Sequence, residues 1–276
     1  MPDVAERRRV FRRLHERGCF VIPNPWDLGS ARLLVQLGFQ ALATTSSGFA
    51  WSTGRPDNHI TLDDALAHFR VLADGVQVPI NADFEKGFAR DPDALARNVV
   101  RAAATGIAAL SVEDSTGDEA DPLFEFPLAV ERIRASRRAL DERTRDVMLV
   151  GRSEGFIAGR PDLRETIRRL TAFAEAGADC LYAPGLRSLA DIEAVVKAVA
   201  PRPVNVLVGS GFTTVAALAE IGVRRISVGG ALARSAWTGF LTAAREIAGQ
   251  GTFNDLGRAV PGIEMNAAFS TPAVKE

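Results

Sequence analysis

Short apolar runs alternate with amphipathic stretches along the whole chain, and this alternation limits the possible folds more than any other feature. Apolar runs of about four to eight residues are typical of buried strands, whereas apolar residues three or four apart are typical of helices. Strands that alternate with helices indicate βα units around a parallel sheet. The sequence predicts eight strands, at residues 19–24, 39–45, 76–83, 107–114, 146–152, 178–184, 202–209 and 223–229.

Residues that begin and end helices support this count. Four of the expected helices end in a glycine, which adopts the left-handed conformation of a helix end at little cost. These glycines are Gly38, Gly106, Gly177 and Gly222. Residues that favour helix starts also occur where they are expected, because Thr61, Asp91 before Pro92, and Asp162 each precede an amphipathic stretch.

Eight βα units, a leading helix at residues 5–17 and a helical tail at 231–248 and beyond 252 favour an α/β fold of the (β/α)8 TIM barrel type. The alternative is an open, doubly wound sheet, which usually carries a glycine-rich phosphate turn after an early strand. This chain has PNPWDLGSA at that point. We therefore expect one barrel domain that spans residues 1–276.

Charge and hydropathy exclude several classes of partner. The 33 basic and 34 acidic residues give a net charge of −1, so neither nucleic acid nor a membrane surface is an expected partner. A run of about 18 apolar residues, as a membrane helix requires, is absent, and the charged N-terminus is unlike a secretory signal. We expect a cytoplasmic protein with reduced Cys19 and Cys180, in which the arginines of residues 7–13 form a solvated helix face.

The scarce residue types exclude several reactions. The three lysines and three histidines show neither Schiff-base surroundings nor zinc-site spacing. The dinucleotide, P-loop and serine-hydrolase motifs are missing from the sequence. The chemistry is therefore expected to rest on carboxylates, arginine, hydroxyl groups and backbone.

Polar residues gather where the expected strands end, and barrel enzymes place their chemistry at these ends. Asp83, Glu85 and Glu113 follow strands 3 and 4, and such a cluster of hard oxygen ligands indicates Mg²⁺ or Mn²⁺. The alternative is that these acids cap helices or pair with Arg90 and Arg152. Strands 6 to 8 offer little ionisable chemistry at their ends.

Two further features of the strand ends have two interpretations each. Arg152 ends strand 5 and is suited to bind a substrate carboxylate in bidentate fashion, or else to form a buried ion pair with Glu113 or Glu154. The run TTSSG after strand 2 is either an anion cradle or an ordinary polar loop. The segment from Gly48 to His59 is long, aromatic and rich in glycine, which favours a lid.

Several long segments, in the same order, resemble the isocitrate lyase and phosphoenolpyruvate mutase superfamily, and specifically its phosphonomutase-like branch. They are PNPWDLGSARLL, ALATTSSGFAWSTGRPD, PINADFEKGF, LSVEDSTG, VGRSEGFIAGRPDLRETIRRL, EAGADCLYAPG and RRISVGGALAR. The resemblance covers nearly the whole chain. It implies a (β/α)8 barrel, Mg²⁺, chemistry on small 2-oxo or 2-hydroxy acids through a pyruvate-type enolate, and a homodimer or homotetramer in which subunits exchange the eighth helix.

The resemblance also implies roles for individual residues. It places substrate binding at Thr45, Ser46, Ser47 and Arg152, a loop acid with a catalytic role at Asp57, and a metal shell at Asp83, Glu113, Glu85 and Asn81. Glu113 and Arg152 are also expected to take part in catalysis. Asn81 departs from the pattern, because the family usually has an aspartate there, and an amide ligand carries one charge fewer.

A second departure concerns the proton donor. Isocitrate and methylisocitrate lyases carry a cysteine-containing segment after strand 4, where this chain reads STGDEADPLFEF. The first interpretation is therefore a Mg²⁺-dependent lyase that cleaves or decarboxylates a 2-oxo or 2-hydroxy acid. The alternatives are a phosphoenolpyruvate mutase-like isomerase of a P–C bond and a non-catalytic protein that binds oxo acids.

Overall fold

The computed structural model describes residues 3–144 and 146–270, and its centre is a sheet of eight parallel strands. Hydrogen-bonded neighbours run in the order β1-β8-β7-β6-β5-β4-β3-β2. The strands are β1 (Phe20–Ile22), β2 (Leu42–Ala43), β3 (Ile80–Asp83), β4 (Ala109–Glu113), β5 (Met148–Arg152), β6 (Cys180–Tyr182), β7 (Val204–Leu207) and β8 (Arg225–Ser227). Each lies inside a predicted run, so all eight strand predictions are confirmed.

The sheet curves until its two ends meet. Strands β1 and β2 share no ladder, but the Ala43 amide donates to the Pro23 carbonyl at 3.0 Å. Beside it, the Asn24 side-chain amide donates to the Thr44 carbonyl at 2.8 Å. These contacts bridge the gap and leave a nearly closed (β/α)8 barrel, as predicted.

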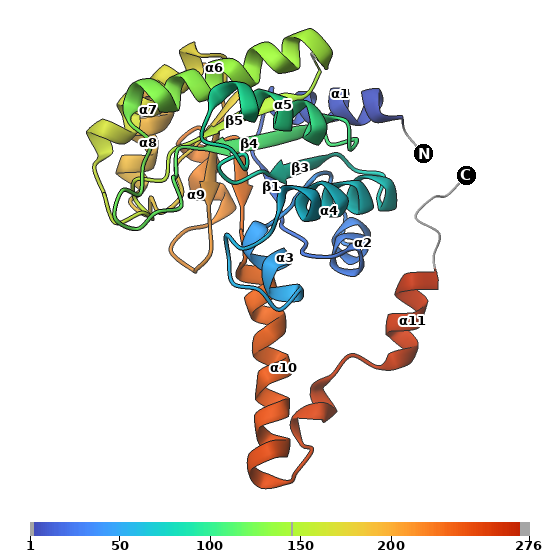
Figure 1. Cartoon of the computed structure of the whole chain (residues 1–276). Coiled ribbons are helices and arrows are strands. Elements are labelled where there is room, and N and C mark those ends of the chain that lie inside the picture. Colours follow the sequence, from blue (N-terminus) through green and yellow to red (C-terminus); the bar gives the residue numbers. More distant parts are fainter. Residues whose placement is uncertain (1–2, 145, 271–276) are drawn as a thin grey trace.

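Helices connect the strands and cover the barrel (Figure 1). They are α2 (Leu28–Gln36), α3 (Ser46–Ser52), α4 (Leu62–Gly75), α5 (Pro92–Ala103), α6 (Phe126–Arg143), α7 (Leu163–Glu175), α8 (Leu189–Val199) and α9 (Val215–Glu220). Thr61, Asp91 and Asp162 each accept a hydrogen bond from a first-turn backbone amide, which confirms all three predicted helix starts. The four predicted glycine helix ends have φ between +86° and +104°.

Helix α1 (Val4–Leu14) packs against the barrel and corrects the prediction for the arginine run. Arg7 and Arg8 are only 7% and 8% exposed. The Arg8 guanidinium donates to the carbonyls of Ile107 and Ala103 at 3.0 and 2.9 Å, and Arg7 donates to the Val76 carbonyl at 3.1 Å. The helical pattern of the sequence does not reveal which arginines contact backbone carbonyls at the ends of other helices and strands. The prediction of a solvated face therefore holds only for Arg9, Arg12 and Arg13, which are exposed.

The last part of the chain leaves the barrel. Helix α10 (Ala231–Gln250) projects away from it, and the chain returns through η1 (Asp255–Arg258) to α11 (Gly262–Ser270), which lies beside α2 (Figure 1). The predicted helical tail is confirmed. Of the residues in α10, only Ala233 and Glu246 are buried.

The described part of the chain also bears on the hydropathy and the cysteines. In residues 3–144 and 146–270, no helix is long and apolar enough to cross a membrane. Both cysteines are free, Cys180 being fully buried and Cys19 half-buried.

Candidate active site

A cavity of about 160 Å³ opens inside the barrel and is lined by residues from all eight strands or the turns after them. Seven of the residues predicted from the sequence border it, namely Thr45, Ser46, Ser47, Asp57, Asn81, Asp83 and Arg152. Glu113 lies behind Arg152 and contacts it, and Glu85 is buried in the turn after β3. The structure thus brings most of the predicted site together around one cavity.

The alternation of side chains along a strand decides which acids face the cavity. On β3, Asn81 and Asp83 both border it. On β4, Ser111 borders it and Glu113 is two residues further on. Asp114, which follows Glu113, faces the other way and pairs with Arg169 of α7 at 3.2 Å. Asp114 therefore supports the fold and is not part of the site.

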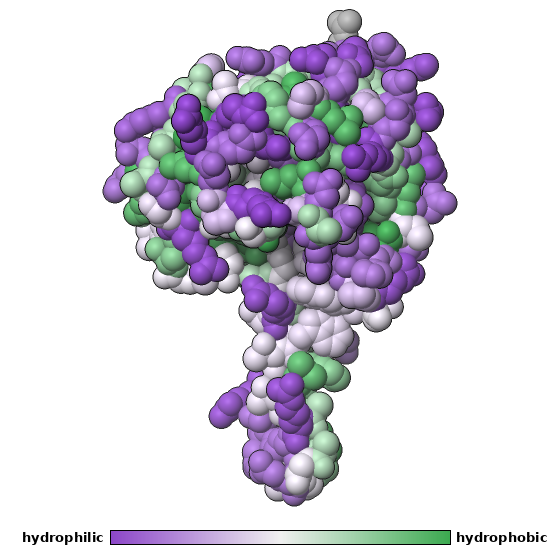
Figure 2. Space-filling view, turned by 60° about the vertical axis from the view of Figure 1, so that its left-hand side comes forward, coloured by the Kyte–Doolittle hydropathy of each residue, from purple (hydrophilic) through white to green (hydrophobic). Residues whose placement is uncertain are grey.

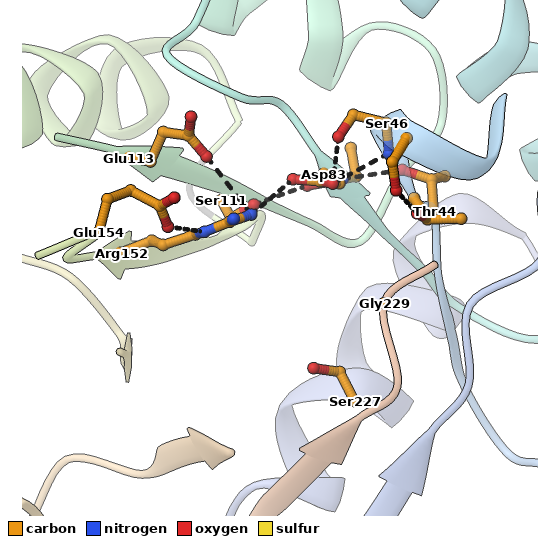
Figure 3. Close-up of polar contacts among 12 residues, drawn as sticks. Thr44, Ser46, Asp83, Ser111, Glu113, Arg152, Glu154, Ser227 and Gly229 are labelled. Carbon is orange, nitrogen blue, oxygen red and sulfur yellow. Dashed lines mark hydrogen bonds and ion pairs between the residues drawn. The ribbon is translucent and has the colours of Figure 1, made fainter. Parts of the chain in front are cut away.

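Arg152 at the end of β5 is the centre of the charge cluster (Figure 3). Its Nη1 lies 3.1 Å from Asp83 Oδ1 and 3.3 Å from Glu113 Oε2, and its Nε pairs with Glu154. Burial alone would lower the pKa of this guanidinium, but the three carboxylates together raise it well above its ordinary value. The ion pairs proposed as one interpretation of Arg152 are therefore present, and the same side chain borders the cavity.

Burial also acts on the acids around Arg152. Desolvation raises the pKa of Glu113 well above its usual range, and Arg152 opposes this shift. Desolvation likewise raises the pKa of Glu154, again against the effect of Arg152. Burial makes the ionised form of these carboxyl groups unfavourable, because the charge is removed from water. A cation beside them favours the ionised form and so stabilises the cluster.

Glu85 is held in a turn with an uncommon backbone conformation. Its φ is +49°, and that of Phe88 is +55°. The fully buried Arg132 of α6 donates to the Arg90 carbonyl at 2.8 Å and to those of Lys86 and Ala89, which fixes this turn. Burial, followed by the charge of Asp83, raises the pKa of Glu85 to about 7. Its Oε1 is buried without a hydrogen-bond partner among the described residues.

The TTSSG segment forms a helix start and not a loop. Thr45 is the N-cap of α3, and its hydroxyl accepts a hydrogen bond from the Gly48 amide. The Ser46 amide and hydroxyl both donate to Asp83 Oδ2, at 3.0 and 2.9 Å. The prediction of a loop from Gly48 to His59 is therefore wrong in its first part, because residues 46–52 are helical, whereas the role of this segment as a lid stays a prediction. The N-cap hydroxyl of Thr45 was the signal for that start.

Asp57 lies on the segment between α3 and α4 and borders the cavity. The residue is exposed as a whole, but desolvation of its carboxyl group and the nearby charge of Asp83 raise its pKa. The Asn58 amide donates to it at 3.0 Å. Its position fits the loop acid that the resemblance implied.

The inner part of the cavity holds polar residues that the sequence prediction missed. Arg225 on β8 is 3% exposed and donates to Asn205 Oδ1 on β7 at 2.9 Å and to Asn81 Oδ1 at 3.3 Å. The Asn205 amide donates to the Ser227 hydroxyl at 2.9 Å. Strand β8 therefore supplies an ionisable group at its first residue, a position that the prediction about strand ends did not cover. The signal was the alternation of Arg225 and Ser227 with apolar residues in a strand expected to be buried.

The oxygen atoms near the outer end of the cavity are suitable ligands for a hard cation. Asp83, Glu85 and Glu113 offer carboxylate oxygens, and the buried Glu85 Oε1 without a partner is an oxygen that a cation would satisfy. Among the described residues, no group of three acids, histidines or cysteines is close enough together to hold a metal ion as it stands. Arg152 lies between Asp83 and Glu113 and pairs with both. The Asn81 oxygen is engaged by Arg225.

Comparison with known proteins gives a consistent result. The profile of the family described as phosphoenolpyruvate phosphomutase matches residues 11–248. A crystal structure from Burkholderia cenocepacia J2315, described as a "putative lyase/mutase", is 45% identical, with a TM-score of 0.95 over 98% of each chain.

Two curated relatives carry named activities. The 2-methylisocitrate lyase of Salmonella typhimurium is 32% identical over 58% of this chain and 55% of its own length. The oxaloacetate decarboxylase of Paraburkholderia xenovorans is 27% identical over 72% of this chain and 68% of its own length. The similar proteins thus include enzymes that break carbon–carbon bonds of small acids.

Proposed function

Because the chain belongs to the phosphoenolpyruvate phosphomutase family, within the superfamily that also contains the isocitrate lyase-type enzymes, we propose that it is a Mg²⁺-dependent lyase for small 2-oxo or 2-hydroxy acids. The observation that carries this proposal is the cavity in which Arg152 and the Thr45–Ser47 hydroxyls meet the carboxylates of β3 and β4. At about 160 Å³ it is smaller than the roughly 300–1,000 Å³ of drug-sized sites. This size suits a short acid better than a nucleotide.

Oxaloacetate is the simplest substrate for such a reaction. The bond between C3 and C4 breaks, its electron pair forms the C2–C3 double bond of an enolate, and C4 leaves as carbon dioxide. A solvent proton then adds to C3 and gives pyruvate. Arg152, with its Nη1 at the cavity wall, would stabilise the oxygen that gains negative charge. The hydroxyls of Ser46 and Ser47 would orient the carboxylate that is retained.

The acids next to Arg152 would hold the metal ion. Asp83 and Glu113, with Glu85 nearby, would form the metal shell, whereas the Asn81 oxygen that the resemblance added to it accepts a hydrogen bond from Arg225. When bound, Mg²⁺ would supply Lewis-acid stabilisation of the enolate oxygen. Asp57 on the segment after α3 would close the site toward solvent and hold a proton near the cavity entrance.

Binding of Mg²⁺ or Mn²⁺ in the presence of oxalate, a mimic of the enolate, tests the proposal. We expect calorimetric titration to show binding to the parent and at least a tenfold loss in Asp83→Asn and Glu113→Gln, because each change removes a charged ligand. Asp121→Asn is the matched control, since Asp121 is exposed on the loop after β4. Parent-like binding by both site variants would show that the metal site is placed wrongly.

A second candidate function is isomerisation of a P–C bond, favoured by the match of residues 11–248 to the phosphoenolpyruvate phosphomutase family. In that reaction a phosphoryl group moves between carbon and oxygen of a pyruvate unit. Phosphorus NMR with phosphonopyruvate separates the two candidates. A new phosphate-ester signal would support the isomerase, and an unchanged spectrum with turnover of oxo acids would support the lyase.

The exposed face of α10 supports a homo-oligomer in which this helix packs on a second subunit. Trp237, Phe240, Leu241 and Ile247 are 37–59% exposed, and Figure 2 shows apolar surface on the projecting arm. Such a patch is unusual on a monomer. Light scattering is expected to give the mass of a dimer or tetramer, and Phe240→Glu is expected to lower it. A monomeric parent would contradict this assembly.

A further inference from the structure

The Arg225 guanidinium is a buried cation that pairs with no carboxylate among the described residues. It is 3% exposed, and its partners are the neutral oxygens of Asn205 and Asn81 and the His15 ring at 3.5 Å. Among residues 3–144 and 146–270, no carboxylate lies within 4 Å of it, whereas Arg152 pairs with three. A guanidinium carries a positive charge, and no carboxylate of the described residues lies close enough to pair with this one.

The side chains that contact Arg225 are neutral, and one of them is a histidine. The His15 Nδ1 lies 2.8 Å from the Phe11 carbonyl, which accepts its proton, so Nε2 faces Arg225 as an acceptor. Burial, followed by the charge of Arg225, lowers the pKa of His15 to about 3, so that its ring is neutral. The histidine therefore orients the guanidinium without balancing its charge.

Arg225 also borders the cavity that contains Arg152. The two arginines lie on β8 and β5, and the cavity between them is lined in addition by Ser227, Asn205 and Tyr182. In Figure 3, Ser227 lies on the opposite side of the barrel from the cluster of Arg152 and Asp83. Small side chains on the strands, such as Ala43 and Ser111, leave this interior open. A short ligand held at Arg152 can therefore extend toward Arg225.

We infer that Arg225 binds one carboxylate of a dicarboxylic acid whose other carboxylate and 2-oxygen lie at Arg152 and Ser46. This inference rests on the proposed function, because it assumes that an acid occupies this cavity. It narrows the substrate class to short diacids. A carboxylate would supply the missing negative charge and accept guanidinium hydrogen bonds, while the Ser227 and Asn205 side chains offer neutral contacts beside it.

Two ligands of equal length test the inference without any variant. Malate and 2-hydroxybutyrate differ only in that a carboxylate of the first is a methyl group in the second. We expect calorimetry in the presence of Mg²⁺ to show malate binding about 10- to 100-fold more tightly, the value of a charge-assisted contact. Equal affinities would overturn the inference and leave the proposed function standing. If neither acid binds, the proposed function fails as well.

Substitutions of Arg225 test whether this residue causes the preference for malate over 2-hydroxybutyrate. Arg225→Gln is expected to reduce the preference for malate to less than about threefold, and Arg225→Lys to retain part of it. Arg224→Gln is the matched control, because its neighbouring guanidinium lies outside the barrel and donates to the Gly18 carbonyl. A full preference in Arg225→Gln would overturn the inference. Melting temperatures show whether a variant is folded, and if Arg225→Gln is not, Arg225→Lys and the ligand pair decide.

Discussion

Replacement of Arg152 by alanine is expected to abolish activity and to destabilise the fold. The Arg152 side chain is 15% exposed and contacts Asp83, Glu113 and Glu154. Removal of one partner from a buried ion pair costs about 3–5 kcal/mol, because the remaining charge is buried alone. For a chain of this size we expect the melting temperature to fall by roughly 10 °C.

Loss of the guanidinium should also lower kcat/KM by at least 10²–10³-fold, the order measured for a single group that stabilises an oxyanion. Arg152→Lys restores the charge but not the planar fork, so it should recover stability more than activity. Arg168→Ala is the control, because Arg168 is exposed, pairs with Glu165 one turn away and stacks over the Phe126 ring, outside the cavity. An Arg152→Ala variant with the parent's melting temperature and activity would contradict both roles.

The second prediction with a large expected effect concerns two substrates of related lyases. Neither isocitrate nor 2-methylisocitrate is expected to be cleaved at the rate of an enzyme. Cleavage of either releases succinate as a carbanion that must be protonated, and a positioned acid is worth roughly 10²–10⁴ in rate. Residues 115–126 contain no cysteine, histidine, lysine or tyrosine that could serve.

The structure gives further reasons for this expectation. Residues 118–121 are exposed, so their acids lie in water and not in a desolvated pocket. Cys180 is buried, which raises the pKa of its thiol, and it lies outside the lining of the cavity. Release of glyoxylate from isocitrate and of pyruvate from 2-methylisocitrate is the measurement. A turnover near 10 s⁻¹, the median for enzymes, with either acid would refute the expectation.

The parts of the fold that could be predicted depend on local sequence. Thr61, Asp91 and Asp162 were recognised as helix starts because a cap bonds an amide only three residues away. The strands were recognised because each is a short apolar run, and all but the run at 146–152 directly follow a glycine or a proline. The segment after strand 2 was interpreted wrongly, since aromatic and glycine residues there obscured a short helix that begins at a threonine cap.

The parts that could not be predicted depend on contacts between distant residues. Arg7 and Arg8 are buried because their side chains meet carbonyls more than 60 residues away. Arg225 was missed because its partners come from α1, β3 and β7, which only the closed barrel brings together. The order of acids at strand ends is visible in the sequence, whereas the pairing of one arginine with three of them is not.

Pyruvate formation from oxaloacetate at several Mg²⁺ concentrations, with the rate in Mg²⁺ alone subtracted, tests the proposed lyase activity most directly. We expect metal-dependent turnover that is at least 100-fold above this background, that oxalate inhibits, and that Asp83→Asn lacks. The same assay extended to a panel of short 2-oxo and 2-hydroxy acids identifies the preferred substrate. Rates equal to the background for oxaloacetate and for every acid of the panel would contradict the assignment of this barrel as a lyase.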